Sequence, residues 1–277
     1  MKKVSSMFDL TGRVVVITGG AGLLGPKHGE AVAEYGGIPV LLDIHKSRAE
    51  EKAADIAKNF GVPALGMGGD VTRKESVEAV KEELEARFGH IDALINNAAN
   101  DPKVTSEAGQ VPWSRFEQFS EDVWHDDIAV GLTGAFLCSQ VFGEGMARRG
   151  KGVIINIASD LGVIAPDQRI YEKEGAPKDR QPVKPVTYSV VKHGLIGLTK
   201  YLATYWATEG VRVNAISPSG VFHNHPQEFV DRLSRLIPMG RMADIDEYKA
   251  AIVFLVSDAS SYMTGSNVII DGGKTCW

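Results

Sequence analysis

An alternation of apolar strand patterns and helical patterns, which begins near the N-terminus, most constrains the fold. The run RVVVITGG, from Arg13, predicts a buried parallel strand, because β-branched residues follow one another without polar alternation. A helix ended by Gly36 is predicted over AGLLGPKHGEAVAEYGG, and a second strand, IPVLLDI, follows it. Strand, helix and strand in this order predict a βαβ unit with parallel strands and a right-handed crossover.

Further units of the same kind fill the rest of the chain. RKESVEAVKEELEARFGH predicts an amphipathic helix. Five more strands are predicted at ALGMGGDV, IDALINNAA, KGVIINIAS, VRVNAISPSG and SNVIIDGG. The expected fold class is therefore α/β, with about seven strands in a doubly wound parallel sheet and helices on both faces.

Ligands in such sheets bind beyond the carboxyl ends of the strands. One glycine, four polar residues and a proline fall at these predicted ends, which indicates a binding edge: Gly19, Asp43, Asp70, Asn97, Ser159 and Pro218.

The first turn, TGGAGLLG from Thr18 to Gly25, is rich in glycine. Glycines let a backbone approach a phosphate, and the N-terminus of the next helix favours the negative charge. Asp43 lies 24 residues after Gly19 (43 − 19), close to the spacing of roughly 20 for a carboxylate that binds an adenosine ribose. A carboxylate there favours NAD over NADP, although His45, Lys46 and Arg48 partly offset its charge.

A second constellation is TYSVVKHG, which places Tyr188 four residues before Lys192. On a helix these two side chains share one face. A phenol ionises near pH ~10 and a nearby ammonium lowers that value. The pair is thus suited to proton exchange near neutral pH.

Charge and composition exclude some classes of protein. The 277 residues carry 30 Lys and Arg against 35 Asp and Glu, a net charge of −5, whereas nucleic-acid binders normally carry a basic surplus. The start, MKKVSSMFDLTGR, has no apolar core of a secretion signal, and no apolar run approaches the ~18 residues of a membrane helix. Cys138 and Cys276 are expected to be free thiols in a reducing cytoplasm, so we expect a cytoplasmic protein. From the net charge and the lack of long apolar runs, we expect no nucleic-acid or membrane partner.

The motifs TGGAGLLG, NNAA, IASDLG, YSVVK and RVNAISPSG, in this order, resemble those of the classical short-chain dehydrogenase/reductase family over about residues 8–273. The resemblance implies one Rossmann-like domain over 1–277, a nicotinamide cofactor and a homotetramer. It also implies a catalytic group of Ser159, Tyr188 and Lys192. The positions it implies for cofactor binding are Gly19, Leu24, Gly25, Asp43, Asp70, Val71, Asn97, Tyr188, Lys192 and Val221.

The sequence departs from the family pattern in the turn and in the proton relay. Leu23 stands at a position of the phosphate turn where the family has glycine. Gly131 stands where most members have an asparagine that relays protons through a water and the lysine. We therefore expect an altered turn and a relay built in another way.

Two loops also depart from the pattern. Ser159 and Tyr188 are 29 residues apart (188 − 159), against about 13 in the family, and an insertion loop over 163–187 is expected near the active site. Tyr171 lies 12 residues after Ser159, near the usual spacing, but it is not expected to be the catalytic tyrosine because Gly175, and not a lysine, lies four residues after it. A substrate lid is expected over 221–240, with His223 where the family often has a threonine near the diphosphate. No metal site is expected from His223 and His225.

The loops expected around the substrate are polar and partly cationic, and include Lys103, Arg169 and His225. They favour a sugar, sugar acid or sugar-nucleotide-like substrate over an apolar substrate such as a steroid or a long acyl chain. NNAANDPKV, APDQRIYE and DGGKTCW resemble bacterial oxidoreductases of flagellin and surface-sugar modification, with gluconate 5-dehydrogenase and D-mannonate oxidoreductase types as close competitors. The alternatives are a 3-oxoacyl-thioester reductase that uses NADPH, and an NAD-binding protein that has lost turnover.

Overall fold

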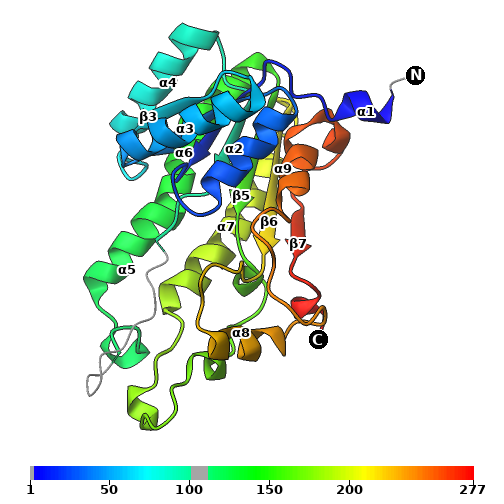
Figure 1. The fold of residues 1–277 in the computed structure, drawn as a ribbon. Coiled ribbons are helices and arrows are strands. Elements are labelled where there is room, and N and C mark those ends of the chain that lie inside the picture. The colour runs from blue at the N-terminus through cyan, green and yellow to red at the C-terminus, as the bar shows by residue number, and fades with distance from the viewer. Residues whose placement is uncertain (1–2, 101–111) are drawn as a thin grey trace.

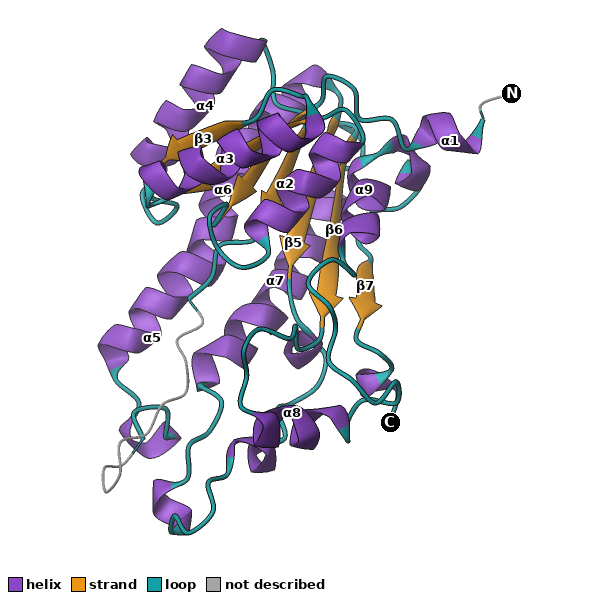
Figure 2. Cartoon of the chain, viewed as in Figure 1, coloured by secondary structure: helices purple, strands orange, loops and turns teal. Residues whose placement is uncertain are grey.

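The computed structural model describes residues 3–100 and 112–277. Its centre is a sheet of parallel strands (Figure 2). The seven strands lie in the order β3-β2-β1-β4-β5-β6-β7, with the crossover point between β1 and β4. The strands are β1 Val14–Thr18, β2 Ile38–Asp43, β3 Leu65–Gly68, β4 Ala93–Asn96, β5 Gly152–Ile157, β6 Val211–Pro218 and β7 Asn267–Ile270. The predicted fold class is confirmed.

Helices cover both faces of this sheet (Figure 1). One face carries α2 Gly25–Glu34, α3 Lys46–Phe60 and α9 Lys249–Val256, and the other carries α4 Lys74–Phe88, α6 Gly134–Arg149 and α7 Val186–Tyr205. The described residues contain three more α-helices, which contribute no residue to these two apolar layers: α1 Val4–Met7, α5 Glu121–Ile128 and α8 Gln227–Ser234.

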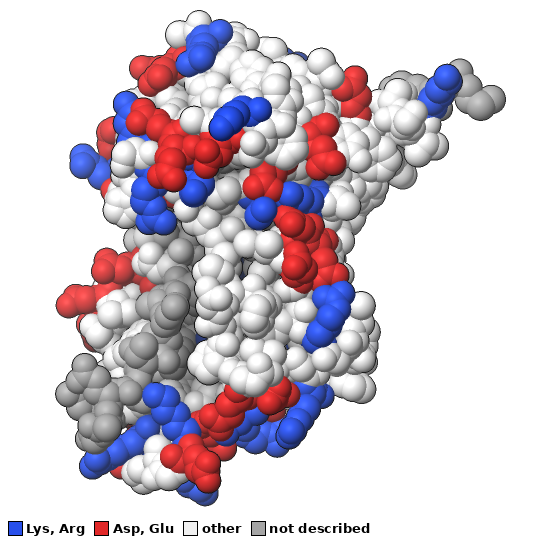
Figure 3. Space-filling model, in the orientation of Figure 1, with Lys and Arg blue, Asp and Glu red and all other residues white. Residues whose placement is uncertain are grey.

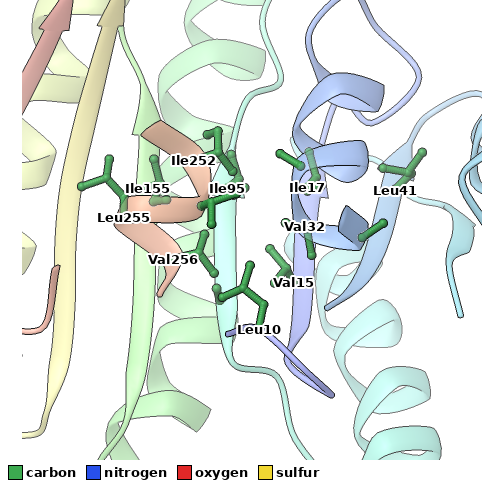
Figure 4. Packing of buried hydrophobic residues seen from close by; sticks show 14 of the residues in the cluster. Leu10, Val15, Ile17, Val32, Leu41, Ile95, Ile155, Ile252, Leu255 and Val256 are labelled. Carbon is green, nitrogen blue, oxygen red and sulfur yellow. The ribbon is translucent and has the colours of Figure 1, made fainter. Parts of the chain in front are cut away.

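The alternation of side chains along each strand divides the core into two apolar layers. Val15 and Ile17 of β1 pack with Val32 of α2 in the layer shown in Figure 4. Val14 and Val16 point to the opposite layer, under α4, α6 and α7. Successive residues of a strand face opposite sides of a sheet, so a strand covered on both faces must be apolar throughout. This is why the strands are continuous apolar runs in the sequence.

All seven predicted strands are present, but some ends differ from the prediction. β3 ends at Gly68, so Asp70 and Val71 lie in the following turn, where Asp70 accepts hydrogen bonds from the N–H and hydroxyl groups of Thr72. α2 begins at Gly25 and not at Ala21, because the preceding residues form the glycine turn. Apolar periodicity therefore located the elements better than their boundaries.

The helical stretch Glu121–Arg149 is long and apolar enough to cross a membrane, by length and composition only. Core helices of globular proteins pass the same test, and α6 packs against β4, β5 and α4 in the core. The stretch is therefore weak evidence for a membrane span.

Charged side chains of both signs are interspersed on the face shown in Figure 3. Neither the basic nor the acidic side chains form one continuous patch on this face. The view agrees with the small net charge of −5. This face lacks the basic tract with which proteins contact a nucleic-acid backbone.

His28 of α2 is a buried titratable group, only 2% exposed. Burial lowers the pKa of His28 to about 4, and neither of its ring nitrogens has a hydrogen-bond partner among the described residues. Because the folded state resists protonation, the stability that neutral His28 contributes is complete above pH ~6.5 and is lost as the pH falls towards 4. The unfolding free energy of the wild type should therefore fall by roughly 3 kcal/mol between pH 6.5 and pH 4 because of His28. In His28→Leu this part of the fall should be absent.

Urea unfolding at pH 7.5, 6.5, 5.5 and 4.5 measures the effect. His125→Leu is the control, because His125 is exposed on α5. An unchanged pH dependence in the His28 variant would contradict the assignment.

Candidate active site

A cleft of about 650 Å³ lies at the carboxyl edge of the sheet. It is lined by the ends of β1, β2, β4, β5 and β6, by α7, and by segments that precede and include α8. Among the residues expected to bind a cofactor or catalyse, all but Gly25 line it: Gly19, Leu24, Asp43, Asp70, Val71, Asn97, Ser159, Tyr188, Lys192 and Val221.

The glycine turn lines this cleft and leaves no room for a side chain at Gly19 or Gly25. Gly19 has a φ of +60°, and a Cβ built on it would lie 2.9 Å from Ala98 Cα. A Cβ on Gly25, at the start of α2, would lie 2.4 Å from the carbonyl oxygen of Gly19. The backbone of the turn can therefore approach a ligand closely, beside the positive end of the α2 dipole.

Asn97 holds the glycine turn against the end of β4. Its side-chain amide donates to the carbonyl oxygens of Thr18, at 2.9 Å, and Gly19, at 3.1 Å. The Thr18 hydroxyl in turn accepts from the backbone N–H groups of Asn97 and Ala98, both at 3.0 Å. Sequence analysis placed Asn97 near a ribose, and the structure adds this clamp on the turn.

Asp43 lies at the end of β2 with its carboxylate fixed by the backbone. One oxygen accepts the Ala21 N–H and the other accepts the His45 N–H, each at 3.0 Å. A carboxylate has about four acceptor positions, so positions remain for the hydroxyls of a ribose. The glycine turn, the start of α2 and this carboxylate on one wall fit a dinucleotide with an adenosine ribose.

Ser159, Tyr188 and Lys192 come together in the same cleft. Lys192 is 5% exposed, and its Nζ donates to the carbonyl oxygen of Ile157, the last residue of β5, at 2.8 Å. The same Nζ lies 5.6 Å from the centroid of the Tyr188 ring. Tyr188 Oη donates to Ser159 Oγ at 3.4 Å. The i, i+4 spacing on α7 thus places an ammonium beside a phenol that contacts a serine hydroxyl.

Two charged residues that sequence analysis missed lie behind Ser159. Asp160 and Lys274 form an ion pair of 2.8 Å, and their side chains are 5% and 8% exposed. Both line the cleft. Each residue lies next to a motif that the sequence analysis used, since Asp160 follows Ser159 and Lys274 belongs to DGGKTCW. However, 114 residues separate the two in the sequence. A pattern of residues alone does not pair positions so far apart.

Gly131 lies in a π-helical turn, Ala129–Thr133, between α5 and α6. A Cβ on Gly131 would lie 2.6 Å from Cγ1 of Val191, the residue before Lys192. A small cavity of about 10 Å³ touches Gly131, Asp127, Tyr188 and Lys192. An asparagine side chain at position 131 therefore has no space, because Val191 occupies it.

The insertion and the segment around α8 meet at the mouth of the cleft. The ring centroids of Tyr171 and Phe229 are 5.6 Å apart, and His225 stacks on Phe229 at 5.3 Å. From the end of the insertion, Lys184 Nζ lies 3.7 Å from the centroid of the Tyr188 ring. Pro166, Asp167 and Ile170 complete the part of the lining that the insertion contributes.

The predicted substrate-facing residue Lys103 lies outside the described residues. His223 is exposed and is not part of the cleft lining, and its N–H donates to Nδ1 of His225 at 3.2 Å. Within residues 3–100 and 112–277, no group of three or more His, Cys, Asp or Glu is arranged to hold a metal ion.

Two family models match most of the chain. Residues 13–171 match the model described as short chain dehydrogenase, and residues 178–275 match the one described as enoyl-(acyl carrier protein) reductase.

Individual proteins match over nearly the full length. D-threitol dehydrogenase of Mycolicibacterium smegmatis is 34% identical over 273 residues, which cover 97% of this chain and 95% of the relative. NAD-dependent glycerol dehydrogenase of Listeria innocua is 34% identical and covers 97% of this chain and 96% of the relative. The crystal structure of a gluconate 5-dehydrogenase from Burkholderia cenocepacia, in complex with NADP and tartrate, has a TM-score of 0.84 and 29% identity, and covers 98% of each chain.

The contact between Gly131 and Val191 leads to a stability prediction. We expect Gly131→Asn to lower the unfolding free energy by about 1–3 kcal/mol, because the new side chain overpacks against Val191. Adding Val191→Ala should recover most of that loss. Urea unfolding of the single and double variants measures both effects.

Gly197→Asn is the control, since a Cβ on Gly197 of α7 would meet nothing within 4 Å. If Gly131→Asn is no less stable than the control, or if Val191→Ala brings no recovery, the steric explanation is wrong.

Proposed function

We propose a mechanism from the premise that this chain belongs to the short-chain dehydrogenase family. The protein is an NAD(P)-dependent oxidoreductase that interconverts an alcohol and a ketone on a sugar-like substrate. The observation that carries the mechanism is the cluster of Ser159, Tyr188 and Lys192 in the same cleft as the glycine turn and Asp43.

In the direction of alcohol oxidation, Tyr188 Oη takes the proton of the substrate hydroxyl. Lys192 stabilises the phenolate that receives this proton, and its own position is fixed by the Ile157 carbonyl. Ser159 Oγ binds the reacting oxygen next to Tyr188. A nicotinamide cofactor held by the glycine turn and Asp43 would accept the hydride from the carbon that carries this hydroxyl. In reduction the proton and hydride move in the opposite direction.

We propose NAD as the preferred cofactor. The support is Asp43, a carboxylate at the end of β2 that binds ribose hydroxyls and repels a 2′-phosphate. Relatives include both kinds, since the Listeria protein is named NAD-dependent and the Burkholderia structure holds NADP. The cofactor roles of Gly19, Leu24, Gly25, Asp70, Val71, Asn97 and Val221 are part of the same proposal.

We propose a polyol or a related sugar alcohol as the substrate class. Threitol and glycerol dehydrogenases among the relatives support this class. The cleft offers Asp167 and Lys184 for hydroxyls, and Tyr171, His225 and Phe229 for the apolar faces of a carbon chain. In this proposal 163–187 is a substrate-facing insertion and 221–240 a lid. The narrower resemblance to flagellin and surface-sugar enzymes stays a prediction.

A homotetramer in the cytoplasm also stays a prediction. Its support is the set of large apolar side chains exposed along α7 and near the C-terminus, which association would cover: Tyr201, Tyr205, Tyr262, Ile269 and Trp277.

Removal of the phenol hydroxyl tests the mechanism. We expect Tyr188→Phe to lower kcat/KM for polyol oxidation by about 10²–10⁴-fold, because no group takes the hydroxyl proton. NADH binding, measured by fluorescence, should change little. Tyr201→Phe is the control, since Tyr201 lies exposed on the same helix.

Full activity in Tyr188→Phe would remove Tyr188 from the mechanism. If the wild type binds NADH yet turns over no polyol or ketose, the alternative of a protein that has lost turnover is favoured.

The charge of Asp43 tests the cofactor preference. We expect the wild type to use NAD in preference to NADP, and Asp43→Ser to raise the ratio of kcat/KM for NADP to that for NAD by at least about tenfold, since a repulsive charge is removed. Steady-state kinetics with both cofactors measures the ratio. A wild type that prefers NADPH and reduces acetoacetyl-CoA faster than any ketose would instead support the 3-oxoacyl-thioester reductase.

A further inference from the structure

Asp160 is the centre of a buried hydrogen-bond network directly behind Ser159. Its Oδ1 accepts from Ser159 Oγ at 2.8 Å and from the Leu161 N–H at 2.7 Å. Its Oδ2 accepts from Ser219 Oγ and from Lys274 Nζ, both at 2.8 Å. Four donors therefore converge on this carboxylate, which uses all of its ordinary acceptor positions.

The network joins three distant parts of the chain. Asp160 follows β5, Ser219 follows β6, and Lys274 belongs to a short 3₁₀ turn after β7. Taking two charges out of water is costly, and a buried ion pair often stabilises a fold no better than apolar residues of the same volume. Stability alone is therefore a weak reason for this pair, and its contact with Ser159 points to a role in the site.

The contacts of Asp160 decide where the single proton of Ser159 lies. A carboxylate that accepts from an ammonium, a hydroxyl and an N–H has no proton to give, so Ser159 donates its proton to Asp160. Ser159 Oγ is then left as an acceptor. It already accepts from the Leu161 N–H at 3.2 Å and faces Tyr188 Oη at 3.4 Å.

This arrangement distinguishes the two substrates of the reaction. In a complex where Tyr188 keeps its proton and donates it to the substrate oxygen, an acceptor position of Ser159 Oγ is left open and an alcohol can donate its hydroxyl proton there. A ketone only accepts, and would need the serine proton to turn away from Asp160. We propose that Asp160, fixed by Lys274, is a positioning residue that holds Ser159 as a hydrogen-bond acceptor and so favours binding of the alcohol over the ketone. This inference rests on the proposed function.

The inference is tested with complexes in which the substrate binds but cannot react, because the cofactor is in the wrong oxidation state. The dissociation constant of the polyol is measured on the enzyme with NADH, and that of the corresponding ketose on the enzyme with NAD, using the polyol that the wild type oxidises best. The test variant is the double substitution Asp160→Ala and Lys274→Met, which leaves no unpaired buried charge.

We expect the polyol to bind about tenfold more weakly and the ketose about tenfold more tightly in this variant, because Ser159 becomes free to donate. In a Ser159→Ala background the same double substitution should have no further effect. The control is Arg13→Met with Asp258→Ala, which removes an ion pair of 2.6 Å that does not line the cleft and should alter neither constant.

Changes of both constants in the same direction, or of neither, would overturn the inference, since a merely structural loss weakens both complexes. A shift that persists without the Ser159 hydroxyl would also overturn it. Failure of the proposed function would look different, because the wild type would then turn over no polyol.

Discussion

The sheet is apolar on both of its faces, and this constraint decides where the site can lie. Side chains of β1 alternate between two apolar layers, so neither face is open to a polar ligand. Groups that must meet a ligand can gather only where the parallel strands end. Asp43 is the last residue of β2, the glycine turn and Ser159 follow β1 and β5, and the cleft lies along this edge of the sheet.

At this edge the protein buries charges that would be costly elsewhere. Lys192 is stabilised by the carbonyl oxygen of the last residue of β5, and Lys274 and Asp160 stabilise each other. Through these contacts the residues around Ser159 are linked to the segments that follow β5, β6 and β7. A change in the C-terminal segment can therefore reach Ser159 through Asp160, although Lys274 lies far from Ser159 in the sequence.

The sequence predicted those features that depend on local patterns. The seven strands followed from apolar runs, and the meeting of Tyr188 and Lys192 followed from helical spacing. The end of β3 and the start of α2 were misplaced, because turn residues there continue the composition of the element beside them. The Asp160–Lys274 pair and the contact of Val191 with Gly131 were not foreseen, since each depends on how distant segments pack.

The most direct test of the account follows a deuterium atom from substrate to cofactor. The protein is incubated with NAD and a polyol deuterated at its carbinol carbons, and the reduced nicotinamide is examined by NMR. The account predicts one deuterium at C4 of the ring, in a single stereochemical position, because a substrate carbon held by the proposed catalytic group would meet only one face of the nicotinamide. Reduced cofactor without deuterium, or no reduction of either NAD or NADP by any polyol, would contradict it.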